Sequence, residues 1–171
     1  LELRFPELEA SFVWLDSFTH APIEQRTTAY EKACILYNTA AQITRVSMQL
    51  NRSDSSTDAL KRAYTGLRQA AGLLQYIKNN FLYAPSDDMK GPALESLSKL
   101  LLAQASEVFL EKSIHDTKGE ALIAKLASHT AHTYSGLSVE WNDTDNLRVP
   151  AMWCRIVACK ADHFMSVAHL Y

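Results

Sequence analysis

The sequence predicts an all-α domain of long antiparallel helices, preceded by a short extended or β segment. Apolar residues recur every three or four positions over most of the 171 residues, which is the period of one helical face. The five glycines and five prolines fall mostly between these periodic segments. Because the segments are about 20 to 27 residues long and the loops are short, neighbouring helices should pack antiparallel, as a bundle or a helical-hairpin solenoid.

Composition indicates an ordinary globular domain. A net charge of -2 and 47% hydrophobic residues allow one domain with a real core, and they disfavour nucleic acid as the main partner. No apolar run is long enough to span a bilayer, and no signal-peptide pattern opens the chain. Cys34, Cys154 and Cys159 fit buried, reduced thiols in a cytoplasmic protein. Because the chain starts without methionine and ends in apolar helical sequence, we expect it to be part of a longer protein.

The first half of the chain predicts a lead-in and two helices. Residues 1–18 contain the aromatic-rich run FVWLDSF, which favours an extended or β lead-in. Pro22 is expected to open the first long helix, with Glu24 in its first turn. The polar run NRSDSST at 51–57 predicts a loop, and the second helix should extend from Asp58 to about Phe81.

The second half predicts three more helices. The third begins at Gly91-Pro92, where proline occupies a permissive first position. A short polar break at 116–118 separates it from the fourth, expected at 119–139. The run WNDTDNLR at 141–148 predicts a loop, and the fifth helix should begin near 149–150 and continue to the end. Gly66 and Gly72 stand isolated within the second helix and indicate close helix crossings.

The main functional hypothesis concerns the stretch QASEVFLEKSIHDTKGEALIAKLA at 104–127. Phe109 and Lys112 lie three residues apart on one predicted helix, and Leu122 and Leu126 lie four apart on the next. Each pair therefore shares one helical face. If the helices fold back on each other, these residues form an apolar patch with a cation at its rim, suited to docking an amphipathic helix. The alternative is that the apolar residues are simply core, the usual place for such side chains.

Histidines and cysteines give only weak signals for chemistry. His129 and His132 lie three apart, but two ligands alone do not make a zinc site, and solvated histidines are the better interpretation. Cys159 and His163 lie four apart beside Asp162, as a thiolate pair would require. The apolar residues that flank Cys159 instead predict a small buried thiol.

Phosphate and carboxylate chemistry is no better supported. The sequence has no glycine-rich phosphate loop. Asp87 and Asp88 lie in a polar run and are typical of caps and turns rather than of an acid–base pair. The residues therefore predict a segment that is not a catalyst and that holds neither a cofactor nor a metal.

Several of these motifs, in order, resemble the Bro-one domain, the module of Alix, HD-PTP (the His-domain protein tyrosine phosphatase) and rhophilin. The resemblance covers essentially the whole chain. Its short runs ILYN, LEKSIHD and VAHLY look most similar to HD-PTP. The motifs that carry the resemblance are FVWLDSF at 12–18, AYEKACILYNTAA at 29–41, RQAAGLLQYIKNNF at 68–81 and LLAQASEVFLEKS at 101–113.

The resemblance implies a tetratricopeptide-like helical-hairpin solenoid core preceded by a small β-element. Residues 1–171 would be the central part of one such domain, with its N- and C-terminal parts missing. The implied function is that of a non-enzymatic adaptor for endosomal sorting and multivesicular body formation. Its implied partner is the C-terminal amphipathic helix of an ESCRT-III subunit, the charged multivesicular body protein of the fourth kind. It would be cytoplasmic and associate with endosomes through partners, without a transmembrane segment or cofactor.

The family's helix-binding site falls, residue by residue, on Phe109, Lys112, Leu122 and Leu126. An acidic residue of that site aligns with Thr57, and Asp58 is adjacent to it, so Asp58 completes the predicted site. The alternative function is a rhophilin-type scaffold in Rho signalling. A phosphatase-like domain, as in HD-PTP, would lie elsewhere in the parent protein.

Overall fold

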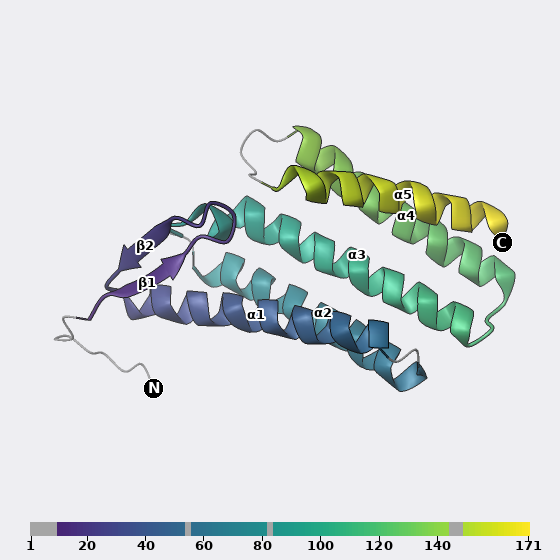
Figure 1. The fold of residues 1–171 in the computed structure, drawn as a ribbon, viewed down its shortest axis with the longest axis horizontal. Helices are drawn as coiled ribbons and strands as arrows, with labels where there is room; N and C mark the ends of the chain where they lie inside the picture. The colour runs from purple at the N-terminus through teal and green to yellow at the C-terminus, as the bar shows by residue number, and fades with distance from the viewer. Residues whose placement is uncertain (1–9, 54–55, 82–83, 144–148) are drawn as a thin grey trace.

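The computed structural model describes residues 10–53, 56–81, 84–143 and 149–171, and in these the chain folds as a β-hairpin followed by long helices (Figure 1). The predicted helical fold with a β lead-in is confirmed, although residues 1–9 of the lead-in lie outside the described residues. In chain order the elements are β1 (Phe12–Leu15), β2 (Pro22–Gln25), α1 (Thr28–Ser53), α2 (Thr57–Asn80), a 3₁₀ helix (Asp87–Met89), α3 (Gly91–His115), α4 (Glu120–Asp143) and α5 (Ala151–Leu170).

The predicted start of the first helix is wrong. Pro22 begins strand β2, which pairs antiparallel with β1 so that Leu15 lies opposite Pro22 and Phe12 opposite Gln25. Helix α1 begins only at Thr28. Proline is tolerated at the first residue of an edge strand as well as at the start of a helix, and local sequence does not distinguish the two.

The loop between the strands is held by the buried carboxylate of Asp16. Its oxygens accept hydrogen bonds from the backbone N–H groups of Phe18 at 2.9 Å, Thr19 at 2.8 Å and Asp88 at 3.1 Å. Asp88 in turn accepts the N–H of Ser17 at 2.8 Å. This reciprocal pair fastens the β-hairpin to the 3₁₀ helix before α3 and gives Asp88 the turn-forming role that its sequence context predicts.

Helix α3 lies between α1 and α2 on one side and α4 and α5 on the other (Figure 1). Its residues Leu94, Leu101 and Val108 belong to one hydrophobic cluster with α1 and α2. Ala103 and Leu110 belong to a second cluster with α4 and α5. The core is therefore two clusters joined through a single helix.

Three other predicted boundaries can be compared with the structure. The break at 116–118 is confirmed: α3 ends at His115, and the next helix starts at Glu120. The loop predicted at 51–57 is wrong in part, because α1 continues through Ser53 and α2 begins at Thr57. The loop predicted at 141–148 is also wrong in part, since α4 continues to Asp143. Residues 54–55 and 144–148 of these loops lie outside the described residues.

The two glycines of α2 differ in their surroundings. A Cβ atom on Gly66 would lie 2.1 Å from the Oγ of Ser47, whose hydroxyl donates a hydrogen bond to the carbonyl of Ile43 at 2.7 Å. A Cβ on Gly72 would meet nothing within 4 Å. The prediction of a close helix crossing is therefore confirmed for Gly66 and wrong for Gly72.

We expect Gly66→Ala to lower the free energy of unfolding by about 1 kcal/mol or more relative to Gly72→Ala. The new methyl at 66 must displace the Ser47 hydroxyl, whereas alanine at 72 gains up to about 1 kcal/mol of helix propensity without a clash. Urea unfolding followed by circular dichroism measures both. In a Ser47→Ala background, Gly66→Ala should no longer destabilise. Equal effects of alanine at 66 and 72 would contradict the proposed crossing.

Asp16 should make the stability of the fold depend on pH. Burial acts to raise the pKa of its carboxyl, but the N–H groups of Thr19, Asp88 and Phe18 stabilise the charge, and the net pKa is lowered from 3.8. A carboxyl with a lowered folded pKa stabilises the fold above its unfolded pKa of about 3.9, and this contribution is lost as the pH falls through the folded pKa.

We expect Asp16→Asn to lower the free energy of unfolding by about 1–3 kcal/mol at neutral pH, because the amide turns a donor toward backbone N–H groups. The difference from wild type should shrink as the pH falls below about 4. Urea unfolding at several pH values measures it. Asp58→Asn is the control, since that carboxyl is 76% exposed. An unchanged difference at low pH would show that the carboxylate charge is not responsible.

Candidate functional site

The predicted site residues of α3 and α4 lie at the protein surface. Phe109 is 41% exposed and Leu122 is 47% exposed, so neither side chain is part of the buried core. Leu126 is half-buried and packs against the second hydrophobic cluster. Lys112 completes the α3–α4 patch, the name used below for Phe109, Lys112, Leu122 and Leu126. The exposure of Phe109 and Leu122 favours the surface interpretation over the core interpretation.

The turn between α3 and α4 places the apolar members of the patch at similar heights. Phe109 lies six residues before the end of α3 at His115, and Leu126 lies six residues after the start of α4 at Glu120. At 1.5 Å per residue, each is about 9 Å from the turn. Leu122 lies one helical turn closer to it. The hairpin therefore places Phe109 and Leu126 at one level on two neighbouring helices, with Leu122 nearer the turn.

Two further side chains extend the patch and escaped the sequence analysis. The ring of Tyr64, on α2, lies 5.6 Å from the ring of Phe109 at an interplanar angle of 40°. Leu102 is 44% exposed and precedes Phe109 by two helical turns, so both lie on one face of α3. The spacing of Leu102 and Phe109 is visible in the sequence, whereas the contact with Tyr64 depends on how α2 packs against α3.

Lys112 is held in place by an ion pair at the polar end of the patch. Its ammonium contacts the carboxylate of Asp116, whose other oxygen accepts a hydrogen bond from the hydroxyl of Thr57 at 3.3 Å. The hydrogen bond from Lys112 is the largest influence on Asp116 and lowers the pKa of that carboxyl. The end of α3 is thereby linked to the start of α2.

Asp58 lies in a different setting from the other predicted site residues. Its carboxylate is 76% exposed and pairs with Arg62 at 3.1 Å. It lines a groove of about 560 Å³ formed by residues of α1 and α2. The structure thus brings Thr57, rather than the carboxylate of Asp58, into contact with the Lys112–Asp116 pair. Asp116 supplies the negative charge at that end of the patch.

The remaining histidines and cysteines do not form a reactive cluster. His129 and His132 are exposed on α4, as the solvated interpretation expects. Cys34 is buried, but Cys159 is exposed, so the prediction of a buried thiol at 159 is wrong. Val157, on the same helix, faces the core. Cys159 lies two residues later, about 200° around the helix axis, and so points away from the core. In the described residues, no three potential metal-ligating side chains gather.

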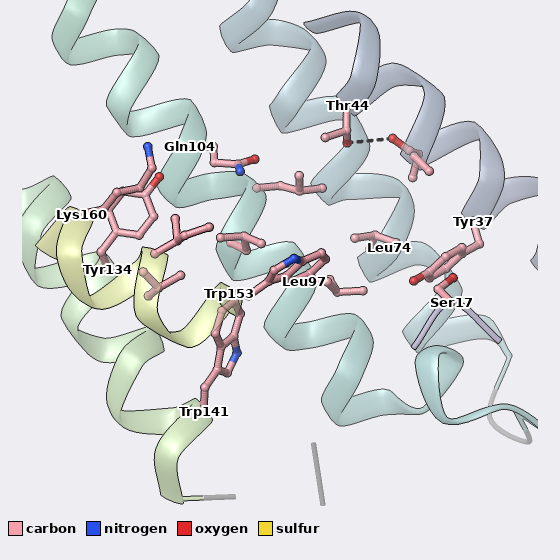
Figure 2. Close-up of a pocket in the computed structure, with 16 residues that line it drawn as sticks. Ser17, Tyr37, Thr44, Leu74, Leu97, Gln104, Tyr134, Trp141, Trp153 and Lys160 are labelled. Atoms are coloured by element: carbon pink, nitrogen blue, oxygen red, sulfur yellow. Dashed lines mark hydrogen bonds between the residues drawn. The ribbon is translucent and has the colours of Figure 1, made fainter. Parts of the chain in front are cut away.

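A groove of about 550 Å³ opens on another side of α3, between α1 and α5 (Figure 2). Its floor includes Leu97 and Gln104, and Leu102 of the patch side lies about 200° around the helix from Gln104. Figure 2 shows Tyr134 and Trp141 on the α4 side of the groove and Trp153 reaching from α5 toward Leu97. The lining is mostly apolar.

Several polar groups at the groove serve to join helices. Glu107 accepts a hydrogen bond from the hydroxyl of Tyr134 at 2.6 Å and forms an ion pair with Lys160. Trp141 donates its indole N–H to the hydroxyl of Ser96. These contacts connect α3 to α4 and α5, which is a structural role. In the part of the chain described here, no helix is both long and apolar enough to cross a membrane.

Comparison with known proteins agrees with the helical architecture. The family model of the BRO1-like domain matches residues 1–171. The vacuolar protein-sorting protein bro1 of Aspergillus fumigatus is 40% identical over 175 residues, an alignment that covers 100% of this chain and 18% of the relative. Human rhophilin-2 is 33% identical over 167 residues, covering 94% of this chain and 24% of the relative.

Solved structures give the same result. A complex of the ALIX BRO1 domain with CHMP4C superposes with a TM-score of 0.84 at 27% identity, covering 96% of this chain and 49% of that chain. A structure described as the basis for endosomal targeting by the Bro1 domain gives a TM-score of 0.79 at 27% identity, covering 92% and 45%. The chain thus spans about half of these solved domains and less than a fifth of its fungal relative.

Proposed function

This chain belongs to the BRO1-like domain family, and on that basis we propose that it is a non-enzymatic adaptor that docks an amphipathic helix on the α3–α4 patch. The observation that carries the proposal is the exposure of Phe109 and Leu122 on a fold shared with the ALIX BRO1–CHMP4C complex. Aliphatic side chains one turn apart on a partner helix would cover Phe109, Leu122 and Leu126, and Lys112 would lie at the edge of the contact.

The proposed partner is the C-terminal helix of an ESCRT-III subunit of the CHMP4 type. Covering three large apolar side chains gains about 1.5–3 kcal/mol each when burial is complete. Since all three are already about half covered or more, and since association carries its own cost, the expected affinity is roughly micromolar. Such an affinity suits an adaptor that binds and releases a subunit during assembly.

The cellular role follows from the relatives. Because several of them are named vacuolar protein-sorting proteins, the proposed role is in endosomal sorting and multivesicular body formation, in the cytoplasm and associated with endosomes through partners. Residues 1–171 would be the central part of one Bro-one domain, since they align with about half of the ALIX chain. The special likeness to HD-PTP stays a prediction.

A rhophilin-type scaffold in Rho signalling is the second candidate. It is favoured by the 33% identity to human rhophilin-2 over 94% of this chain. The two candidates share a fold and differ in whether the α3–α4 patch binds the ESCRT-III helix.

We expect Leu122→Asp and Leu126→Asp each to weaken binding of a fluorescent CHMP4C C-terminal helix by roughly tenfold or more. A carboxylate cannot be buried without a partner against the apolar face of the helix. Fluorescence anisotropy with the full-length protein measures the affinity. Leu122 is the sharper position, because its exposure allows the fold to tolerate the charge.

Val139→Asp is the matched control, since it places the same charge on an exposed position of α4, three to four turns from the patch. Circular dichroism verifies that each variant is folded. Equal affinities of Leu122→Asp and Val139→Asp for the helix would show that the helix does not bind at the α3–α4 patch. Failure of the wild-type protein to bind the helix would favour the rhophilin-type role.

A further inference from the structure

A row of three side chains leads from the α3–α4 patch to a positive charge on α2. The ring of Phe109 lies 5.6 Å from that of Tyr64, and the guanidinium carbon of Arg68 lies 5.4 Å from the centre of the Tyr64 ring. Arg68 also donates a hydrogen bond to the hydroxyl of Tyr64 at 3.1 Å. Arg68 is exposed, so its guanidinium is stacked on a ring and still faces solvent.

No carboxylate of the described residues forms an ion pair with Arg68. The ammonium groups of Lys61 and Lys125 also form none there, but only Arg68 of these three lies over an aromatic ring. Lys112 is paired with Asp116, and Arg62, on the same helix as Arg68, is paired with Asp58. The Tyr64 hydroxyl is neutral and uses only part of the donor set of a guanidinium, which has five N–H groups in a planar fork. The remaining N–H groups can donate two parallel hydrogen bonds to a carboxylate.

We infer that Arg68 is a specificity-determining residue that pairs with an acidic side chain of the docked helix. This inference rests on the proposed function, because it requires a helix on the α3–α4 patch. The two steps from Phe109 to Tyr64 and from Tyr64 to Arg68 are each close to the helical pitch of 5.4 Å. The acidic residue of the partner therefore lies within about two turns of the apolar residue that covers Phe109.

The aromatic row gives this charge more selectivity than a free surface arginine would have. Stacking on Tyr64 restricts the guanidinium, so less conformational entropy is lost when it pairs. The adjoining apolar surface excludes water from one side of the contact when a helix is docked, which strengthens the ion pair. A helix with the right apolar spacing but a lysine at the facing position would be disfavoured by like-charge repulsion.

The test measures binding of the CHMP4C C-terminal helix by fluorescence anisotropy to the full-length protein, as wild type, Arg68→Gln and Arg68→Glu. Arg68→Gln should weaken binding roughly two- to fivefold, as expected for an ion pair at the rim of an interface, and Arg68→Glu should weaken it further. The loss should shrink between about 0.1 M and 1 M salt, as the Debye length falls from about 10 to 3 Å. Arg62→Gln, on the same helix but paired with Asp58, is the matched control.

Peptide variants identify the partner of Arg68. Each acidic residue of the CHMP4C helix is replaced in turn by its amide, and one replacement should weaken binding to wild type but not to Arg68→Gln. Additive effects for every acidic residue, or equal affinities of Arg68→Gln and Arg62→Gln, would overturn the inference. If wild type binds the helix and Leu122→Asp does not, either of these two outcomes contradicts only the pairing of Arg68, and the proposed function stands. If wild type binds no helix, the proposed function fails first.

Discussion

Helix α3 has to pack on two sides at once. Leu101 and Val108 face the cluster of α1 and α2, while Ala103 and Leu110 face the cluster of α4 and α5. A helix surrounded in this way needs apolar residues around most of its circumference, and its sequence is correspondingly rich in leucine and alanine. Among the described helices, α3 contributes buried residues to both clusters and so holds the two helical pairs in register with each other. The position of the α3–α4 patch depends on the same packing, because Phe109 and Lys112 project from it.

A partly buried polar node strengthens one side of this arrangement. Glu107 of α3 meets the hydroxyl of Tyr134 on α4 and the ammonium of Lys160 on α5, and Lys160 also lies 5.5 Å from the centre of the Tyr134 ring. Burial and the nearby Glu107 charge raise the pKa of Tyr134, so its hydroxyl stays a donor. Removing Glu107 or Lys160 would leave the other, partly desolvated charge unpaired, which is costly. The node therefore specifies how three helices meet, beyond what apolar contact alone requires.

Local sequence predicts the long helices well, because each has apolar residues every three or four positions and is bounded by turn-forming residues. The start of α3 at Gly91-Pro92 and the break at 116–118 depend on signals within a few residues. The β-hairpin is different: Pro22 is compatible with a helix start, and the strand forms because β1 pairs with it and Asp88 fastens its loop. Gly66 and Gly72 look alike in sequence, and only the approach of α1 separates them.

The candidate site shows the same division between local and tertiary information. The spacing in the sequence identifies the four residues of the α3–α4 patch as candidates, and resemblance to a family assigned them a role. Tyr64 and Arg68 could not be selected, since their proximity to Phe109 arises from the packing of α2 on α3. Likewise, the choice between Thr57 and Asp58 depends on which of two adjacent side chains faces the end of α3, and consecutive helical residues point about 100° apart.

The turn between α3 and α4 makes the patch compact in the gene as well as in space. All four of its residues lie within one hairpin, so insertions or rearrangements elsewhere in the chain leave their relative positions intact. Tyr64 and Arg68 are encoded separately, on α2. During divergence, the apolar anchors can therefore persist as an inherited unit while charge at the α2 edge is altered independently. Duplicated copies of such a domain can therefore come to bind different partners through changes on α2, while the α3–α4 hairpin stays the same.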